Sequence, residues 1–119
     1  MSRIALLAAG LVATLALAGP IGASSNVTKL TGTVGPGFTI TLKKGAAKVK
    51  TLKAGTYKIT VNDKSNIHDF HLMGPGVNKM ITGTPFKGTK TVTVKLKKGT
   101  YRYVCDPHAS AMKGSFKVT

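Results

Sequence analysis

Short segments in which apolar and polar residues alternate constrain this sequence more than any other feature. Residues 38–42, 57–61, 92–96 and 101–105 each place an apolar side chain at every second position. A β-strand with one buried face has this period of two, because successive side chains point to opposite sides of the sheet. Turns that contain glycine separate the segments, and no helical period accompanies them. The pattern predicts an all-β protein.

Four further segments read as strands, namely residues 27–34, 48–52, 68–72 and 116–118. Residues 62–66 form a polar turn, and residues 74–88, which include Pro75 and Pro85, are expected to form a loop. About eight short strands joined by such turns are typical of an antiparallel β-sandwich. We therefore expect that architecture.

The N-terminal segment has the form of a secretory signal. Arg3 precedes a run without charge from residue 4 to residue 18, and Pro20 and small residues follow. This pattern predicts a signal peptide over residues 1–23 and a single domain over residues 24–119. An uncleaved membrane anchor is the alternative, although a span needs about 20 apolar residues. We expect the protein to be exported, to the periplasm, the cell surface or the extracellular space.

The charge balance is strongly basic. The 119 residues include 18 Lys plus Arg and only 3 Asp plus Glu, which gives a formal net charge of +15. Such a field favours anionic partners. The chain has no basic motif interleaved with aromatic residues, so nucleic acid is not an expected partner.

One short loop gathers residues that bind soft metals. The chain's only cysteine, Cys105, is followed by His108 and then by Met112. Thiolate, imidazole and thioether together suit copper in both of its common oxidation states. A lone cysteine is unusual in an exported protein, because oxidising compartments pair or damage free thiols. We expect a metal or burial to protect Cys105; a small core residue is the simpler alternative.

A second histidine is needed from elsewhere in the chain. His68 shares its parity with Phe70 and Leu72, so it should point inward with them, while Asp69 and His71 face the other side;. His71 is the competing ligand, because a bulge would reverse this parity. Met73 and Met80 are expected to pack rather than to bind metal.

These residues together resemble the cupredoxins, in particular the group of plastocyanin, amicyanin and pseudoazurin. The resemblance covers most of residues 24–119 and implies a Greek-key β-sandwich with one copper ion held by His68, Cys105, His108 and Met112. Three residues separate His108 from Met112, whereas plastocyanin-like members have four and amicyanin-like members two. Asp69 stands where many relatives have an asparagine that links the two ligand segments.

The expected function is that of a secreted type 1 (blue) copper protein, a monomer that carries single electrons between larger redox partners. Side chains fill every metal position, so no site is left for a substrate and we do not expect an enzyme. The redox partners are expected to be acidic, and anionic cell-surface polymers are further candidates. The main alternative is a copper-delivery protein outside the cytoplasm; a basic adhesion domain with a degenerate site is more remote.

Residues next to the ligands are expected to support them. Asp106 is a candidate to hold the ligand loop in place, and Pro107 stiffens that loop. Together with Ala109 and Ala111, Pro107 forms a small uncharged ring around His108. We expect a redox partner to dock there.

Overall fold

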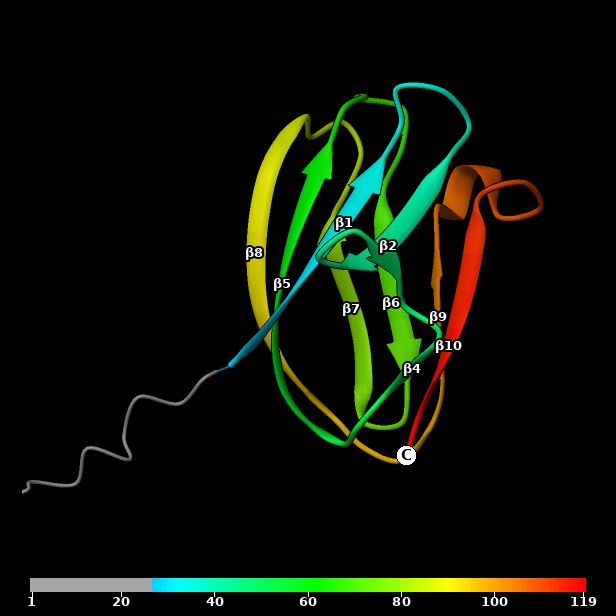
Figure 1. The fold of residues 1–119 in the computed structure, drawn as a ribbon. Coiled ribbons are helices and arrows are strands. Elements are labelled where there is room, and N and C mark those ends of the chain that lie inside the picture. Colours follow the sequence, from blue (N-terminus) through cyan, green and yellow to red (C-terminus); the bar gives the residue numbers. More distant parts are fainter. Residues whose placement is uncertain (1–26) are drawn as a thin grey trace, which may run out of the picture.

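The computed structural model describes residues 27–119, which form a sandwich of two five-stranded sheets (Figure 1). The predicted signal peptide and its cleavage site lie outside the described residues. Within residues 27–119 the structure has ten strands, one 3₁₀ turn and no α-helix. No helix there has the length and hydropathy of a membrane span.

The first sheet, which we call sheet A, has the strand order β3-β2-β1-β5-β8. Its strands are β3 (Ala47–Lys48), β2 (Ile40–Lys44), β1 (Thr28–Val34), β5 (Gly55–Asp63) and β8 (Gly88–Leu96). Burial alternates along β5, where Tyr57, Ile59 and Val61 face the core as the sequence predicts. The prediction of a half-buried strand there is confirmed.

The second sheet, sheet B, has the order β4-β10-β9-β6-β7. Its strands are β4 (Thr51–Leu52), β10 (Lys113–Val118), β9 (Gly99–Val104), β6 (Phe70–Gly74) and β7 (Val77–Thr82). On β9 the Tyr101 and Tyr103 rings are fully buried, and Cys105 follows them into the interior. A Cβ atom at Gly114, the cross-strand neighbour of Tyr103, would overlap the Tyr103 ring, so only glycine fits beside it.

The all-β sandwich is confirmed, but its sheets are mixed rather than purely antiparallel. β1 pairs parallel with β5, and β4 pairs parallel with β10. The chain crosses from one sheet to the other before each of these pairings. A crossing between sheets leaves no periodic pattern in the sequence. The alternation of apolar and polar residues therefore predicts where strands lie, but not whether they pair in parallel.

Two local predictions are wrong. The expected strand over residues 48–52 is divided into β3 and β4, which belong to different sheets on either side of the buried Val49. β7 lies inside the expected loop over residues 74–88. The sequence did not predict this strand, because Asn78, Lys79 and Met80 are exposed on an edge strand and show no alternation. An edge strand buries less of its surface, which weakens the sequence signal.

The core lies between the sheets, and the loops that matter for function meet at one end of it. The β1–β2 and β5–β6 connections and the 3₁₀ turn η2 (Asp106–His108) lie together at the upper end of the sandwich in Figure 1. We call this end the loop pole.

Candidate metal centre

Two loops of the loop pole bring the predicted ligands together. His68 follows the polar turn after β5, and Cys105 and His108 come from the connection between β9 and β10. His68 and Cys105 are fully buried, and His108 is partly exposed. His68 precedes β6 rather than lying on it, yet its side chain points inward as its parity with Phe70 predicts.

Three possible donor atoms converge in this cluster. Cys105 Sγ lies 3.7 Å from His68 Nδ1 and 3.6 Å from His108 Nδ1, and the two Nδ1 atoms are 3.1 Å apart. A shared cation would satisfy the lone pairs of all three atoms.

The size of this triangle fits a transition metal. The circle through the three atoms has a radius of about 2 Å, which matches the metal–nitrogen bonds of histidine at about 2.0–2.1 Å. Two imidazoles and one thiolate form the trigonal set found in blue-copper sites. The residues present therefore fit a single copper ion.

Burial shapes the chemistry of the cysteine. It raises the pKa of the Cys105 thiol above its usual value, and the nearby Asp69 and Asp106 charges act in the same direction. The backbone N–H groups of Asp69 and His108 oppose this increase. The Asp69 N–H approaches Cys105 Sγ at 3.5 Å, so it can donate a hydrogen bond to a thiolate held there.

Asp69 ties the two ligand segments to each other. Its Oδ1 accepts a hydrogen bond of 2.7 Å from the backbone N–H of Asp106, beside the contact of its own N–H with Cys105 Sγ. Asp69 is buried, and this burial raises the pKa of its carboxyl group. The expectation that Asp69 faces away from the interior is wrong, because residues 68 and 69 precede the regular strand. Asp69 thus joins the segment of His68 to the segment of Cys105.

Backbone hydrogen bonds close the ligand loop. The N–H of Cys105 donates to the carbonyl of Met112 at 3.0 Å, the N–H of His108 to that of Cys105 at 3.0 Å, and the N–H of Met112 to that of His108 at 2.8 Å. Met112 is fully buried in the same hydrophobic cluster as Cys105. The loop therefore holds its shape through main-chain contacts.

His71, the competing ligand, is not part of this cluster. Its Nδ1 lies 2.9 Å from Asp106 Oδ2, and its Nε2 faces Asn78 Oδ1. Both ring nitrogens are thus engaged away from Cys105 and His108. The β6–β7 pairing does shift register between Phe70 and His71, but this irregularity leaves His68 with the cluster.

Met73 and Met80 also lie apart from this cluster. Met73 is half-buried on β6, and Met80 on β7 has 43% of its surface exposed. Met80 is therefore not a core residue, although the sequence analysis expected it to pack.

Phe38 is a residue of the site that the sequence analysis missed. Its ring meets the rings of His68 and His108 edge-on, at centroid distances of 5.5 and 4.9 Å, and 60% of its surface is exposed. Alternation placed it inside a strand, but β2 begins only at Ile40. The sign of this role in the sequence is an aromatic residue directly after the turn at residues 35–37.

Comparison with known protein families gives a match over most of the described chain. The family described as copper binding proteins of the plastocyanin/azurin type matches residues 33–119. Amicyanin-alpha from Methylorubrum extorquens is 38% identical over 69 residues, which cover 56% of this chain. The match spans 57% of that relative's length.

Solved structures show the same fold. A rusticyanin variant has a TM-score of 0.54 and 26% identity, with 76% of each chain covered. Reduced rusticyanin has a TM-score of 0.51 and 26% identity, covering 76% of this chain and 78% of its own. A chain of a haem-copper terminal oxidase dimer, at 23% identity and a TM-score of 0.53, resembles this protein in fold; the match covers 76% of this chain and 63% of that one.

Proposed function

Because this chain belongs to the plastocyanin/azurin family of copper-binding proteins, we propose that it is an exported blue copper protein that carries single electrons between larger redox proteins. The observation that carries this proposal is the convergence of His68 Nδ1, Cys105 Sγ and His108 Nδ1 within a buried triangle. Copper is the cofactor, and it supplies one-electron chemistry by alternating between Cu(I) and Cu(II).

We assign the ligand roles as follows. His68 and His108 would hold the copper through Nδ1, Cys105 through its thiolate, and Met112 would add a weak thioether. Imidazole and thiolate would supply most of the binding strength, whereas the methionine would mainly tune the reduction potential. The hydrogen bond from the Asp69 N–H withdraws electron density from the sulfur and so favours the reduced state.

The rigidity of the protein supports fast electron exchange. His68 is fixed by burial, and Cys105, His108 and Met112 are fixed by the closed hydrogen bonds of their loop. Asp69 joins the two segments through the Asp106 N–H. Ligands held in this way move little when the charge on the metal changes, so the barrier from structural rearrangement stays low.

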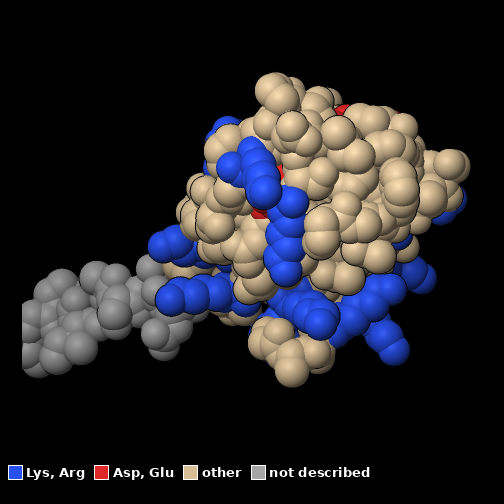
Figure 2. Space-filling view, turned by 90° about the horizontal axis from the view of Figure 1, so that it is seen from above, with Lys and Arg blue, Asp and Glu red and all other residues tan. Residues whose placement is uncertain are grey.

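The loop pole is suited to brief docking. Phe38 and Ile67 are exposed by 60% and 52%, and Pro107, Ala109 and Ala111 are exposed beside the partly exposed His108. Viewed onto this pole, much of the surface is free of Lys and Arg, which gather toward one side and the lower rim (Figure 2). An apolar patch of this kind allows close contact through which electrons pass by His108.

The surrounding lysines then select the partner. Their charge favours acidic redox proteins and anionic cell-surface polymers in the periplasm, at the cell surface or outside the cell. The protein acts as a monomeric carrier and not as an enzyme. Membrane anchorage has no part in this proposal.

Copper loading tests the proposal directly. The native protein should bind one equivalent of Cu(II), become intensely blue and undergo reversible one-electron reduction. In Cys105→Ser the thiolate-to-copper band should be absent, because a serine hydroxyl is a poor and weakly acidic ligand. An intense blue band in Cys105→Ser would exclude this site. Tight Cu(I) binding without a stable Cu(II) form would instead favour copper delivery.

A further inference from the structure

The outer face of sheet A has an unusual composition. Its side chains alternate with the core residues and point away from sheet B. They are threonines, lysines and one asparagine: Lys29, Thr31, Thr33, Thr41, Lys43, Lys48, Thr56, Lys58, Thr60, Asn62, Thr89, Thr91, Thr93 and Lys95. We call this surface the Lys/Thr face. It has no carboxylate, aromatic or aliphatic side chain.

Strand register orders these side chains into rows across the sheet. Thr31 lies beside Thr60, which pairs with Thr91 through their hydroxyl groups at 3.0 Å. Lys29 lies beside Lys58 in the next row. Neighbouring strands are about 4.8 Å apart, so the face presents hydroxyl and ammonium groups on a regular grid.

No charge within the described residues balances these lysines. Among residues 27–119 the single ion pair is His71 with Asp106, and no Lys or Arg takes part in one. Lys29 faces Lys58, and Lys43 faces Lys48, on paired strands. Like charges placed directly across a strand pair repel each other. An anion lying over the sheet would relieve this repulsion.

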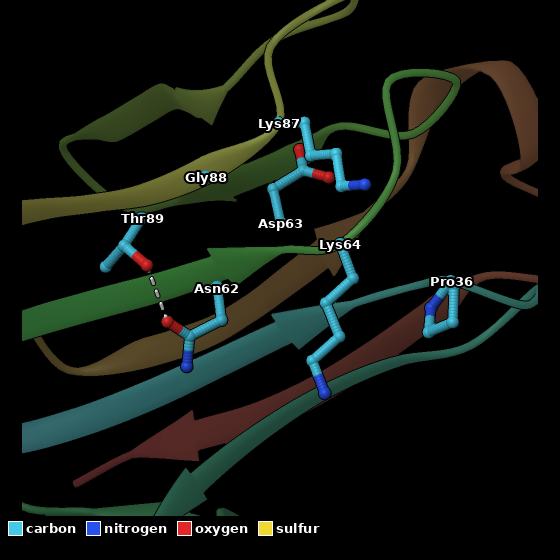
Figure 3. Close-up of a pocket in the computed structure, with 7 residues that line it drawn as sticks. All are labelled: Pro36, Asn62, Asp63, Lys64, Lys87, Gly88 and Thr89. Atoms are coloured by element: carbon cyan, nitrogen blue, oxygen red, sulfur yellow. Dashed lines mark hydrogen bonds between the residues drawn. The ribbon is translucent and has the colours of Figure 1, made fainter.

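A hollow continues the Lys/Thr face toward the loop pole (Figure 3). It is lined by Pro36, Asn62, Asp63, Lys64, Lys87, Gly88 and Thr89. Thr89 Oγ1 donates to Asn62 Oδ1 at 2.9 Å on one wall, and Lys64 and Lys87 extend along the others. The buried Asp63 has an Oδ2 atom without a hydrogen-bond partner in residues 27–119. Because this oxygen is itself buried, the hollow presents the two ammonium groups of Lys64 and Lys87 to a ligand.

From this arrangement we infer that the Lys/Thr face and its hollow bind an acidic polysaccharide. The acid groups of such a polymer would pair with the lysines of the face and of the hollow, while its hydroxyl groups would bond to the threonines. Insertion into a lipid surface needs exposed apolar residues, and stacking of unpaired bases needs aromatic side chains. The Lys/Thr face has neither.

This inference deepens the proposed function. It rests on one element of that proposal, namely that the protein lies outside the cytoplasm near anionic polymers. Sheet A runs lengthwise to the loop pole, where His108 is partly exposed (Figure 1). A polymer held along its outer face would reach only the rim of that pole, at Pro36 and Lys64. The carrier would stay concentrated at an acidic surface while it exchanges electrons.

Binding of copper-loaded protein to polygalacturonate, with neutral dextran as reference, tests the inference. The double variant Lys29→Gln with Lys58→Gln should weaken binding roughly thirtyfold, since each lysine near an anionic surface contributes about fivefold to the affinity. The matched control is Lys50→Gln with Lys117→Gln, which removes the same charge from exposed positions outside the Lys/Thr face. It should change the affinity by less than about twofold.

Three outcomes would overturn the inference. The first is an equal loss of affinity in both double variants, which would mean that net charge alone is responsible, and the second is no preference for polygalacturonate over dextran. The third is binding to phosphatidylglycerol vesicles or duplex DNA that is tighter than binding to polygalacturonate and is weakened by Lys29→Gln with Lys58→Gln. The visible copper spectrum, recorded on every sample, reports the proposed electron carrier separately. An intact spectrum without polymer binding would reject only the polysaccharide site.

Discussion

The imidazole of His71 lies 2.9 Å from the Asp106 carboxylate, and so connects β6 to the loop that holds Cys105 and His108. Burial lowers the pKa of His71, but hydrogen bonds to Asn78 and Asp106 and the charges of Asp106 and Asp69 outweigh it. The net pKa is raised above its ordinary value. His71 therefore supports the ligand loop best when it is protonated.

This relationship predicts a pH-dependent contribution to stability. A raised folded-state pKa gives stability that is fully present below the unfolded value of about 6.5 and is lost as the pH rises through the folded value. In the metal-free protein, His71→Gln should cost about 0.5 kcal/mol near pH 5 and less near pH 8. The cost is small because 44% of the Asp106 side chain is exposed. Urea unfolding of both proteins across this range measures the difference.

Asp69 also makes stability depend on pH, because its pKa is raised. Both proteins contain Asp69, so its contribution cancels in the difference between the native protein and His71→Gln. A cost that is constant from acid to alkaline pH would show that the His71–Asp106 pair contributes through shape and not through charge.

The two upstream histidines should differ in their effect on copper. His68→Ala removes one corner of the donor triangle and should abolish the native blue spectrum, because the remaining ligands cannot form the trigonal set;. His71→Ala should leave the spectrum nearly unchanged and retain one equivalent of copper. Visible absorption and metal analysis of both variants check this. The reverse pattern would assign the ligand role to His71.

Met112 should tune the potential more than it holds the metal. Met112→Leu keeps a buried side chain of similar volume but removes the thioether, so Cu(II) loses a donor and the reduction potential should rise. Copper content should stay within about twofold of the native protein if the three trigonal ligands provide most of the affinity. Voltammetry and metal analysis give both values. Complete loss of copper would make Met112 a principal ligand.

Docking at the loop pole should respond to charge. Electron exchange with an acidic redox protein should slow as salt rises, because the Debye length shrinks to about 8 Å at physiological ionic strength. Ala109→Asp adds a negative charge beside His108 and should slow exchange further, on the order of tenfold at low salt. Stopped-flow measurements follow the rate, with an unchanged copper spectrum as the control for the site. Rates that respond to neither change would place the docking surface elsewhere.

Several elements of the fold could be predicted because their residues alternate. Tyr57, Ile59 and Val61 share a buried face as expected, and so do Tyr101 and Tyr103. β7 could not be predicted in this way, since most of its side chains are exposed at a sheet edge. The parallel pairing of β1 with β5 joins segments far apart in the chain, and nothing local in either segment records its partner.

The sequence by itself determined the kind of chemistry, because the residues of the ligand loop are close in the chain and their side chains prefer copper. It also determined that the protein is an all-β sandwich, since the period of two is a local property of each strand. Only the tertiary structure decided that His68, and not His71, meets Cys105, because a turn of a few residues before β6 sets the direction of both rings. It also decided that Phe38 lies against the histidines and that the lysines of five strands form one surface on which no ion pair balances them. Those arrangements depend on packing between distant strands, which local patterns do not encode.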